Sequence, residues 1–237
     1  MQPTPPVVII TCRVLVSALE RLLPADLAEQ VTVLDYGLHR VPVKLTDGVQ
    51  EAIDAVETPS LIMLGYGLCG NGLRGIQSRE HTLLIPRTDD CIAILLGSYR
   101  AYMRRFQAEP GTYYLTKGWL ESGSDPLREY REYSARWDET TAMWLMDQQY
   151  SHYKRVALVA PNAEEMAQYR ERAQEVARFC ERWGMTYEEV LGSDEYVEGL
   201  VGAMIALRDT GELPARLASD YLVIPPRSEI EQAMFMR

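Results

Sequence analysis

Short, continuous apolar runs rich in β-branched residues punctuate this chain. Such runs are typical of strands that are buried on both faces, as in a parallel sheet. They occur at residues 7–10, 31–34, 61–64, 82–85, 112–115, 156–159 and 221–224, with a weaker one at 186–191. Glycine or proline follows several of them directly, and these residues are expected to end the strands.

Between these runs, apolar residues recur at helical spacing. The spacing predicts helices over residues 14–23, 47–56, 163–183 and 195–208, and another helix that starts at Asp89 or Asp90 as its N-cap and runs to about Phe106. Strands that alternate with helices predict an α/β fold, here a doubly wound, mainly parallel sheet flanked by helices in a three-layer sandwich.

The length of 237 residues fits one domain over residues 1–237. Only the largely helical stretch near residues 119–153 is a candidate hinge, should the chain fold as two lobes. We find no repeats, low-complexity segments or clear linker.

Composition narrows the class of protein. A net charge of −10 opposes binding to phosphate backbones, so no nucleic-acid partner is expected. No apolar run approaches the roughly 20 residues that span a bilayer, so no membrane association is expected. The first residues lack the basic region of a signal peptide, which predicts a cytoplasmic protein. Four cysteines are too few for a disulfide framework, and in the cytosol they stay reduced unless they bind metal or serve redox chemistry.

The positions of three cysteines are the main functional signal. Cys12 lies two residues past the first predicted strand, Cys69 five residues past the third, and Cys91 in the first turn of the helix after the fourth. Because the carboxyl ends of parallel strands meet at one edge of a sheet, we expect the three thiols to gather there. The alternatives are separately buried small residues and a redox pair. Cys180 lies within a long helix and is assigned to packing.

A shared thiol site implies a soft metal. Thiolates favour zinc or an iron–sulfur cluster, and Cys91 lies near a helix N-terminus that favours its thiolate form. Three protein ligands leave a fourth position open, as in catalytic sites. His81, Asp89 or Asp90 could close the site instead, but His81 begins its strand at the opposite edge, which favours the open position. No compact C-x-x-C motif is present, so the signal from spacing alone is weak.

The segment after the third strand is rich in glycine and matches G-x-G-x-x-G. The dinucleotide fingerprint follows the first strand, however, and further glycines here indicate a longer loop rather than a prompt helix. Close approach of the loop to a ligand or cluster is therefore expected, against the alternative of a tight turn without ligand. The candidate ligand-binding residues of this loop are Gly67, Gly70, Asn71 and Gly72.

Two further segments are expected at the same edge. Arg87 leaves the fourth strand and would either hold an anionic ligand or pair with Asp90. Asp90 would cap the following helix or act as a general acid or base. The predicted strand at 112–115 ends at the same edge, so Lys117 and Trp119, which follow it, are expected to line the pocket.

Three motifs resemble a prokaryotic family of domains of unknown function: residues 66–72 (YGLCGNG), 86–91 (PRTDDC) and 110–119 (PGTYYLTKGW). The resemblance extends over nearly the whole chain and includes an early cysteine like Cys12. It departs at Asp89, where family members often carry histidine. Genes of the family often stand beside components of corrinoid-dependent methyltransferases, so the resemblance implies a link to one-carbon or methylamine-type metabolism.

Together these observations favour a protein with zinc or an iron–sulfur cluster on Cys12, Cys69 and Cys91, a small-molecule ligand beside it, and a corrinoid protein or methyltransferase as partner. Whether it catalyses turnover stays open at this point. Two alternatives remain: a non-catalytic accessory protein that docks a corrinoid protein or its reactivator, and a nucleotide-binding enzyme that uses the glycine-rich loop.

Overall fold

The computed structural model describes residues 4–27 and 31–237. The chain divides into two compact units, one made of Met1–Tyr99 and Asp194–Arg237 (unit 1) and one of Arg100–Ser193 (unit 2). The predicted mixed α/β class, with a mostly parallel sheet flanked by helices, is confirmed. The strands belong to two sheets, however, a division that the strand pattern did not reveal. Residues 119–153 lie within unit 2, and the single-domain organisation stays a prediction.

Unit 1 contains a five-stranded sheet. In spatial order its strands are β2 (Val31–Leu34), β1 (Val7–Cys12), β3 (Leu61–Gly65), β4 (Thr82–Pro86) and β8 (Tyr221–Ile224). The first four are parallel, and β8 alone pairs antiparallel, with β4. All five residues of β3 are buried, because this apolar strand lies at the centre of the sheet.

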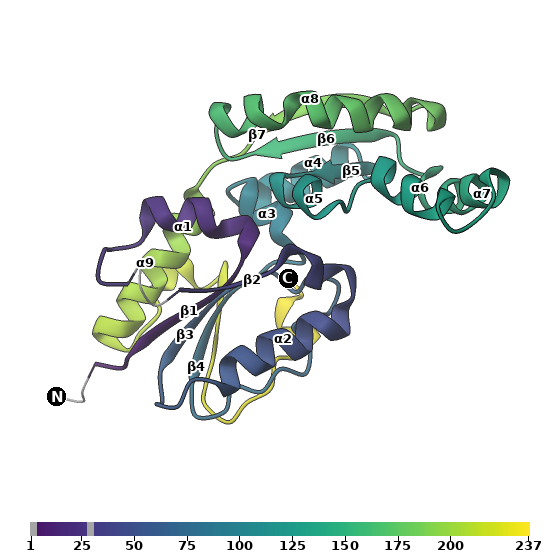
Figure 1. Ribbon diagram of the computed structural model, residues 1–237. Helices are drawn as coiled ribbons and strands as arrows, with labels where there is room; N and C mark the ends of the chain where they lie inside the picture. Colours follow the sequence, from purple (N-terminus) through teal and green to yellow (C-terminus); the bar gives the residue numbers. More distant parts are fainter. Residues whose placement is uncertain (1–3, 28–30) are drawn as a thin grey trace. The chain divides into compact units, whose positions relative to one another are not determined.

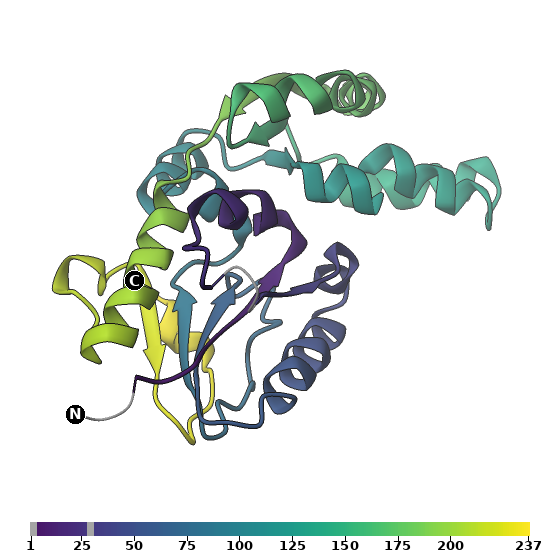
Figure 2. The same cartoon turned by 60° about the vertical axis from the view of Figure 1, so that its left-hand side comes forward.

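Helices cover both faces of this sheet and make three layers (Figures 1 and 2). One face packs against α2 (Pro42–Asp54), which buries Leu45, Val49 and Ile53 against the strands. The other face carries α1 (Val16–Leu22) and α9 (Glu195–Thr210), which also contact each other. Short 3-10 helices complete the unit: η1 (Arg13–Leu15), η3 (Tyr36–Arg40), η5 (Ala215–Leu217) and η6 (Gln232–Phe235).

The predicted long helix over residues 90–106 is two helices, α3 (Cys91–Leu95) and α4 (Tyr99–Ala108). Gly97 lies between them with φ of 83°, a left-handed conformation that ends a helix and that glycine adopts without strain. The helical spacing continues across this break, so periodicity alone did not reveal it.

Unit 2 contains a parallel three-stranded sheet in the order β5 (Thr112–Leu115), β6 (Arg155–Ala160) and β7 (Thr186–Leu191). The amphipathic α8 (Ala163–Cys180) packs on β6 and β7 and ends in η4 (Glu181–Trp183). Three helices fill the connection from β5 to β6: α5 (Lys117–Ser122), α6 (Pro126–Ser134) and α7 (Glu139–Tyr150).

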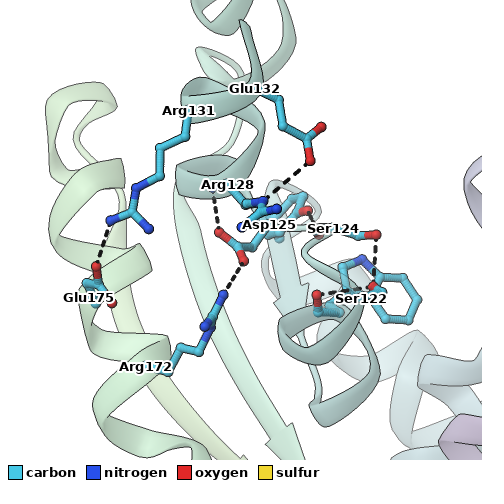
Figure 3. A network of polar contacts seen from close by, with 10 residues as sticks. Ser122, Ser124, Asp125, Arg128, Arg131, Glu132, Arg172 and Glu175 are labelled. Atoms are coloured by element: carbon cyan, nitrogen blue, oxygen red, sulfur yellow. Dashed lines mark hydrogen bonds and ion pairs between the residues drawn. The ribbon is translucent and has the colours of Figure 1, made fainter. Parts of the chain in front are cut away.

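A buried carboxylate ties α6 to α8 (Figure 3). Asp125 is 1% exposed, and one of its oxygens caps α6 by accepting the N–H of Arg128 at 2.9 Å. Its second oxygen has no hydrogen bond within the described part of the chain, and it forms an ion pair with the Arg172 guanidinium of α8 at 3.6 Å. Asp125 therefore acts as a structural charge that joins two helices.

Within the described residues, no helix has both the length and the apolar composition needed to cross a membrane.

The register of β1 against β3 requires glycine at position 65. Thr11 stands opposite Gly65, and a Cβ on Gly65 would lie 2.1 Å from the Thr11 hydroxyl oxygen. We expect Gly65→Ala to cost roughly 1–3 kcal/mol of unfolding free energy through overpacking, measured by urea denaturation.

Gly202→Ala is the matched control. Gly202 lies inside α9, and a Cβ there would meet nothing within 4 Å. Because alanine favours the helix, this change is expected to stabilise the protein by about 0.5–1 kcal/mol. Equal effects of the two substitutions would contradict the packing argument.

Candidate functional site

Three parallel strands of unit 1 end at one edge of the sheet. Cys12 is the last residue of β1, Gly65 ends β3 and Pro86 ends β4. The parallel pairing of β1 with β3 and of β3 with β4 places these ends together, as expected from the sequence. Cys12 therefore lies at the same edge of the sheet from which the loops that lead to Cys69 and Cys91 start.

Main-chain hydrogen bonds join the loop after β3 to the loop after β4. The N–H of Leu68 donates to the carbonyl of Thr88, and the N–H of Cys69 donates to the carbonyl of Asp89, both at 2.8 Å. Cys69 adopts a left-handed conformation with φ of 50°, which a non-glycine residue holds only when its surroundings require it. These bonds bring Cys69 beside the start of α3.

Gly67 allows this close approach. A Cβ on Gly67 would lie 2.9 Å from the backbone atoms of Asp90, closer than real Cβ contacts come. The glycine at position 67 is therefore explained by the contact between the two loops, and a bound ligand is not needed to explain it.

Cys12 and Cys69 both pack against the core of unit 1 and both affect the thiol of Cys91. Burial is the main cause that raises the pKa of the Cys91 thiol, and Cys69 and Cys12 raise it further by their charge. The pKa of Cys69 is raised in the same way, first by burial and then by Cys12. The thiols are free, and in the described part of the chain no three or more His, Cys, Asp or Glu side chains are already arranged to hold a metal ion.

Backbone N–H groups lower the pKa of all three thiols against the larger effect of burial. The N–H of Val14 lowers the pKa of Cys12, but burial dominates and raises it to about 11. The N–H groups of Gly67 and Cys91 act likewise on Cys69. Without a cation, the thiols are protonated near neutral pH, while the donors that would stabilise thiolates are already in place.

Tyr66 is a site residue that the sequence reasoning missed. It follows β3 directly, is 3% exposed, and its hydroxyl has no hydrogen-bond partner among the residues that the structure describes. Burial is the main cause that raises its pKa, and the charges of Cys12, Cys69 and Asp35 raise it further. Tyr66 belongs to the core cluster of unit 1 against which Cys12 and Cys69 pack. Its position two residues past a predicted buried strand, like that of Cys12, was the available signal.

Asp90 is the N-cap of α3, as predicted. Its carboxylate accepts the N–H of Ile92 at 2.8 Å. Burial raises the pKa of this carboxyl to about 6, against the opposing effect of the capped N–H group. Asp90 also raises the pKa of Cys69 and Cys91, so its charge is part of the electrostatics of the site.

Arg87 holds the C-terminal segment. Its guanidinium donates to the carbonyls of Met234 and Met236, and its own carbonyl accepts from Arg237. These contacts differ from both expectations for Arg87, an anion clamp and a pair with Asp90. Its place at the strand end was correctly predicted. Its partners come from a segment about 150 residues later, and no local sequence pattern predicts that contact.

The rest of the glycine-rich loop is a turn without a following helix. Gly70 and Asn71 both have positive φ and are exposed. Gly72 is buried against α2, where a Cβ would lie 2.6 Å from Leu45. The extended loop agrees with the sequence interpretation, whereas a ligand-binding role for these residues stays a prediction.

Lys117 and Trp119 belong to α5 of unit 2, after a strand of the second sheet. Their expected place at the edge with the cysteines assumed that all the strands form one sheet. Because β5 belongs to a different sheet from β1, β3 and β4, that expectation has lost its basis. Cys180 is fully buried in the core of unit 2, as expected for a packing residue. His81 precedes β4 at the opposite edge, where its Nδ1 accepts the N–H of Ser60.

A family model described as "protein of unknown function (DUF1638)" matches residues 33–201. The chain belongs to this family. The matched residues include Cys69 and Cys91 and begin after Cys12. No curated protein and no solved structure matches the chain. Membership in DUF1638 therefore supports the family resemblance but assigns no activity.

Asp90 makes stability depend on pH. A carboxyl with a raised pKa contributes stability that is present below its unfolded value near 3.8 and is lost as pH rises through about 6. Asn caps a helix as well as Asp does and carries no charge. We therefore expect Asp90→Asn to match the wild type at pH 4 and to be more stable at pH 7.5 by up to about 3 kcal/mol, measured by urea denaturation at both values.

Asp138→Asn serves as the control, because Asp138 is an exposed N-cap whose pKa is lowered by its hydrogen bonds to Thr141. Its stability effect should have the opposite sign at pH 7.5. A loss of stability in Asp90→Asn at pH 7.5 would show that the buried charge at this position is favourable.

Proposed function

We propose that unit 1 is a metal-binding unit whose ligands are Cys12, Cys69 and Cys91. One observation carries the proposal: main-chain hydrogen bonds join the loop of Cys69 to the loop before Cys91, at the edge of the sheet where β1 ends in Cys12. In agreement with this placement, Cys12 raises the pKa of Cys69, and both raise the pKa of Cys91. One buried and two partly buried thiolates would repel one another, so their charged forms together favour a cation among them.

The centre would require the cysteine side chains to move, because in the described residues they are not arranged to hold an ion. Rotation about χ1 moves a cysteine sulfur between staggered positions without moving the backbone. A zinc ion would draw the sulfurs to about 2.3 Å from itself, whereas an iron–sulfur cluster holds its ligands further apart. Thiols that are neighbours without being preassembled for one ion are compatible with the larger cluster as well as with zinc.

Three protein ligands leave one metal position for a ligand from solution. In the zinc form, the ion would act as a Lewis acid on a thiol or another methyl acceptor. With a corrinoid partner, Cys12, Cys69 and Cys91 would hold the ion that favours the thiolate form of the acceptor, and the corrinoid would supply the methyl group. The family resemblance supports this link, and a reduced cytoplasmic setting suits it because all four cysteines are free thiols.

One observation favours the accessory role as a second candidate. In unit 2, Trp137 lies just before α7 and is 56% exposed, and Trp144 lies on α7 and is 58% exposed. Exposed tryptophans are enriched among the residues that dominate binding between proteins. If docking is the function, Trp144→Ala should weaken capture of a purified corrinoid protein, while serine substitutions of the three cysteines leave it intact.

Metal content tests the proposed centre. We expect protein purified without oxygen to carry stoichiometric zinc if colourless, or iron and sulfide if brown, by elemental analysis and absorption spectroscopy. Serine substitution of Cys12, Cys69 or Cys91 should weaken metal binding by more than the 10- to 100-fold typical of changes outside the ligand set. Because binding displaces thiol protons, affinity should rise with pH.

Cys180→Ser is the control, since Cys180 is buried in unit 2. It should lower stability and leave metal content unchanged. Wild-type protein that neither carries metal nor takes up zinc or iron under reducing conditions would overturn the proposed centre.

A further inference from the structure

A cavity of about 410 Å³ opens beside α9, and all the residues that line it belong to unit 1. Its walls come from the first two turns of α9, the junction of α3 and α4, η5 and the start of β8. Tyr221 at the start of β8 pairs with Pro86 at the end of β4, so the cavity lies at the edge where the parallel strands end. Open α/β sheets bind their ligands outside this edge, and small-molecule sites have volumes of about 300–1,000 Å³.

Hydrogen bonds between wall residues hold one side of the cavity in place. The hydroxyl of Tyr196 donates to the carbonyl of Asp220, and the hydroxyl of Tyr221 donates to the carbonyl of Tyr196, both at 2.6 Å. The two tyrosine rings also meet edge to face, with their centroids 5.2 Å apart. A ligand that binds against this wall therefore has few side chains to order, which lowers the entropic cost of binding.

Gly202 is a wall residue that packing does not explain. It lies inside α9, where glycine costs about 1 kcal/mol relative to alanine. A Cβ at this position would meet nothing within 4 Å, so no neighbouring atom requires its absence. The missing side chain instead leaves the cavity open, and a ligand that occupies the cavity would account for the glycine.

Two side chains of opposite charge line the cavity without neutralising each other. Glu198 of α9 and Arg216 of η5 are both exposed, and within residues 4–27 and 31–237 neither side chain has an ion-pair partner. A ligand with a single charge would be attracted by one of these groups and repelled by the other. A ligand with both charges would satisfy both, because a guanidinium pairs with a carboxylate and a carboxylate with an ammonium group.

We infer that this cavity binds a free amino acid with an apolar side chain. Its carboxylate would pair with Arg216 and its ammonium group with Glu198. Its side chain would lie against Leu217 and the two wall tyrosines. A few charged groups beside an apolar wall are typical of small-molecule sites. This is a second site of unit 1, and it does not depend on the proposed metal centre.

Calorimetric titration of the protein with L-leucine tests the site, together with two analogues that each lack one charge. Leucinamide has no carboxylate, and 4-methylpentanoate has no ammonium group. We expect each analogue to bind at least about 10-fold more weakly than L-leucine, because each loses one charge-assisted contact.

Substitutions assign each ligand charge to its wall residue. Arg216→Gln should weaken L-leucine at least about 10-fold and leave leucinamide unchanged. Glu198→Gln should weaken L-leucine similarly and leave 4-methylpentanoate unchanged. Gly202→Leu should abolish binding of all three compounds by filling the cavity. Its melting temperature should not fall, because leucine favours a helix more than glycine does.

Glu171→Gln and Arg178→Gln are the matched controls, since both residues are exposed on α8 of unit 2. They should leave all three affinities unchanged. Failure of millimolar L-leucine to bind the wild type would overturn the inference. Binding that Arg216→Gln, Glu198→Gln and Gly202→Leu all leave unchanged would place the amino acid elsewhere and would overturn it as well.

Discussion

The site of this protein depends on a close approach of two stretches of backbone. Residues 67–69 lie against residues 88–90 through two main-chain hydrogen bonds and the bare Cα of Gly67. Any side chain at position 67 would push the two loops apart and separate Cys69 from the start of α3. The chemistry of the thiols is thus secondary to a packing condition that only glycine meets.

Burial and hydrogen bonding act on the thiols in opposite directions. Burial raises the pKa of all three, while N–H groups favour the charged forms of Cys12 and Cys69, and the Tyr66 hydroxyl remains unpaired. A site designed only for packing would need none of these donors. Apolar neighbours and oriented donors together are typical of an environment that keeps thiols neutral until a cation arrives.

The sequence predicted the strands of unit 1, their parallel order at the edge, and the cap at Asp90, because each follows from local patterns and from the geometry of parallel sheets. It did not predict the second sheet, because the residues of a strand such as β5 do not indicate which sheet the strand joins. It also missed the partners of Arg87, which lie at the other end of the chain. The sequence did not reveal Tyr66, because whether a hydroxyl has a hydrogen-bond partner depends on how the chain packs.

The path of the chain has a consequence for biogenesis. The polypeptide leaves unit 1 at Tyr99, makes the whole of unit 2, and returns at Asp194. The sheet of unit 1 gains its last strand only from residues 221–224, and Arg87 finds its acceptors only at Met234 and Met236. During synthesis at the ribosome, all residues of unit 2 are therefore made before those of unit 1 are complete. Until residues 221–224 are made, β4 lacks its neighbour β8, and the sheet beside the cysteine-bearing loops is incomplete.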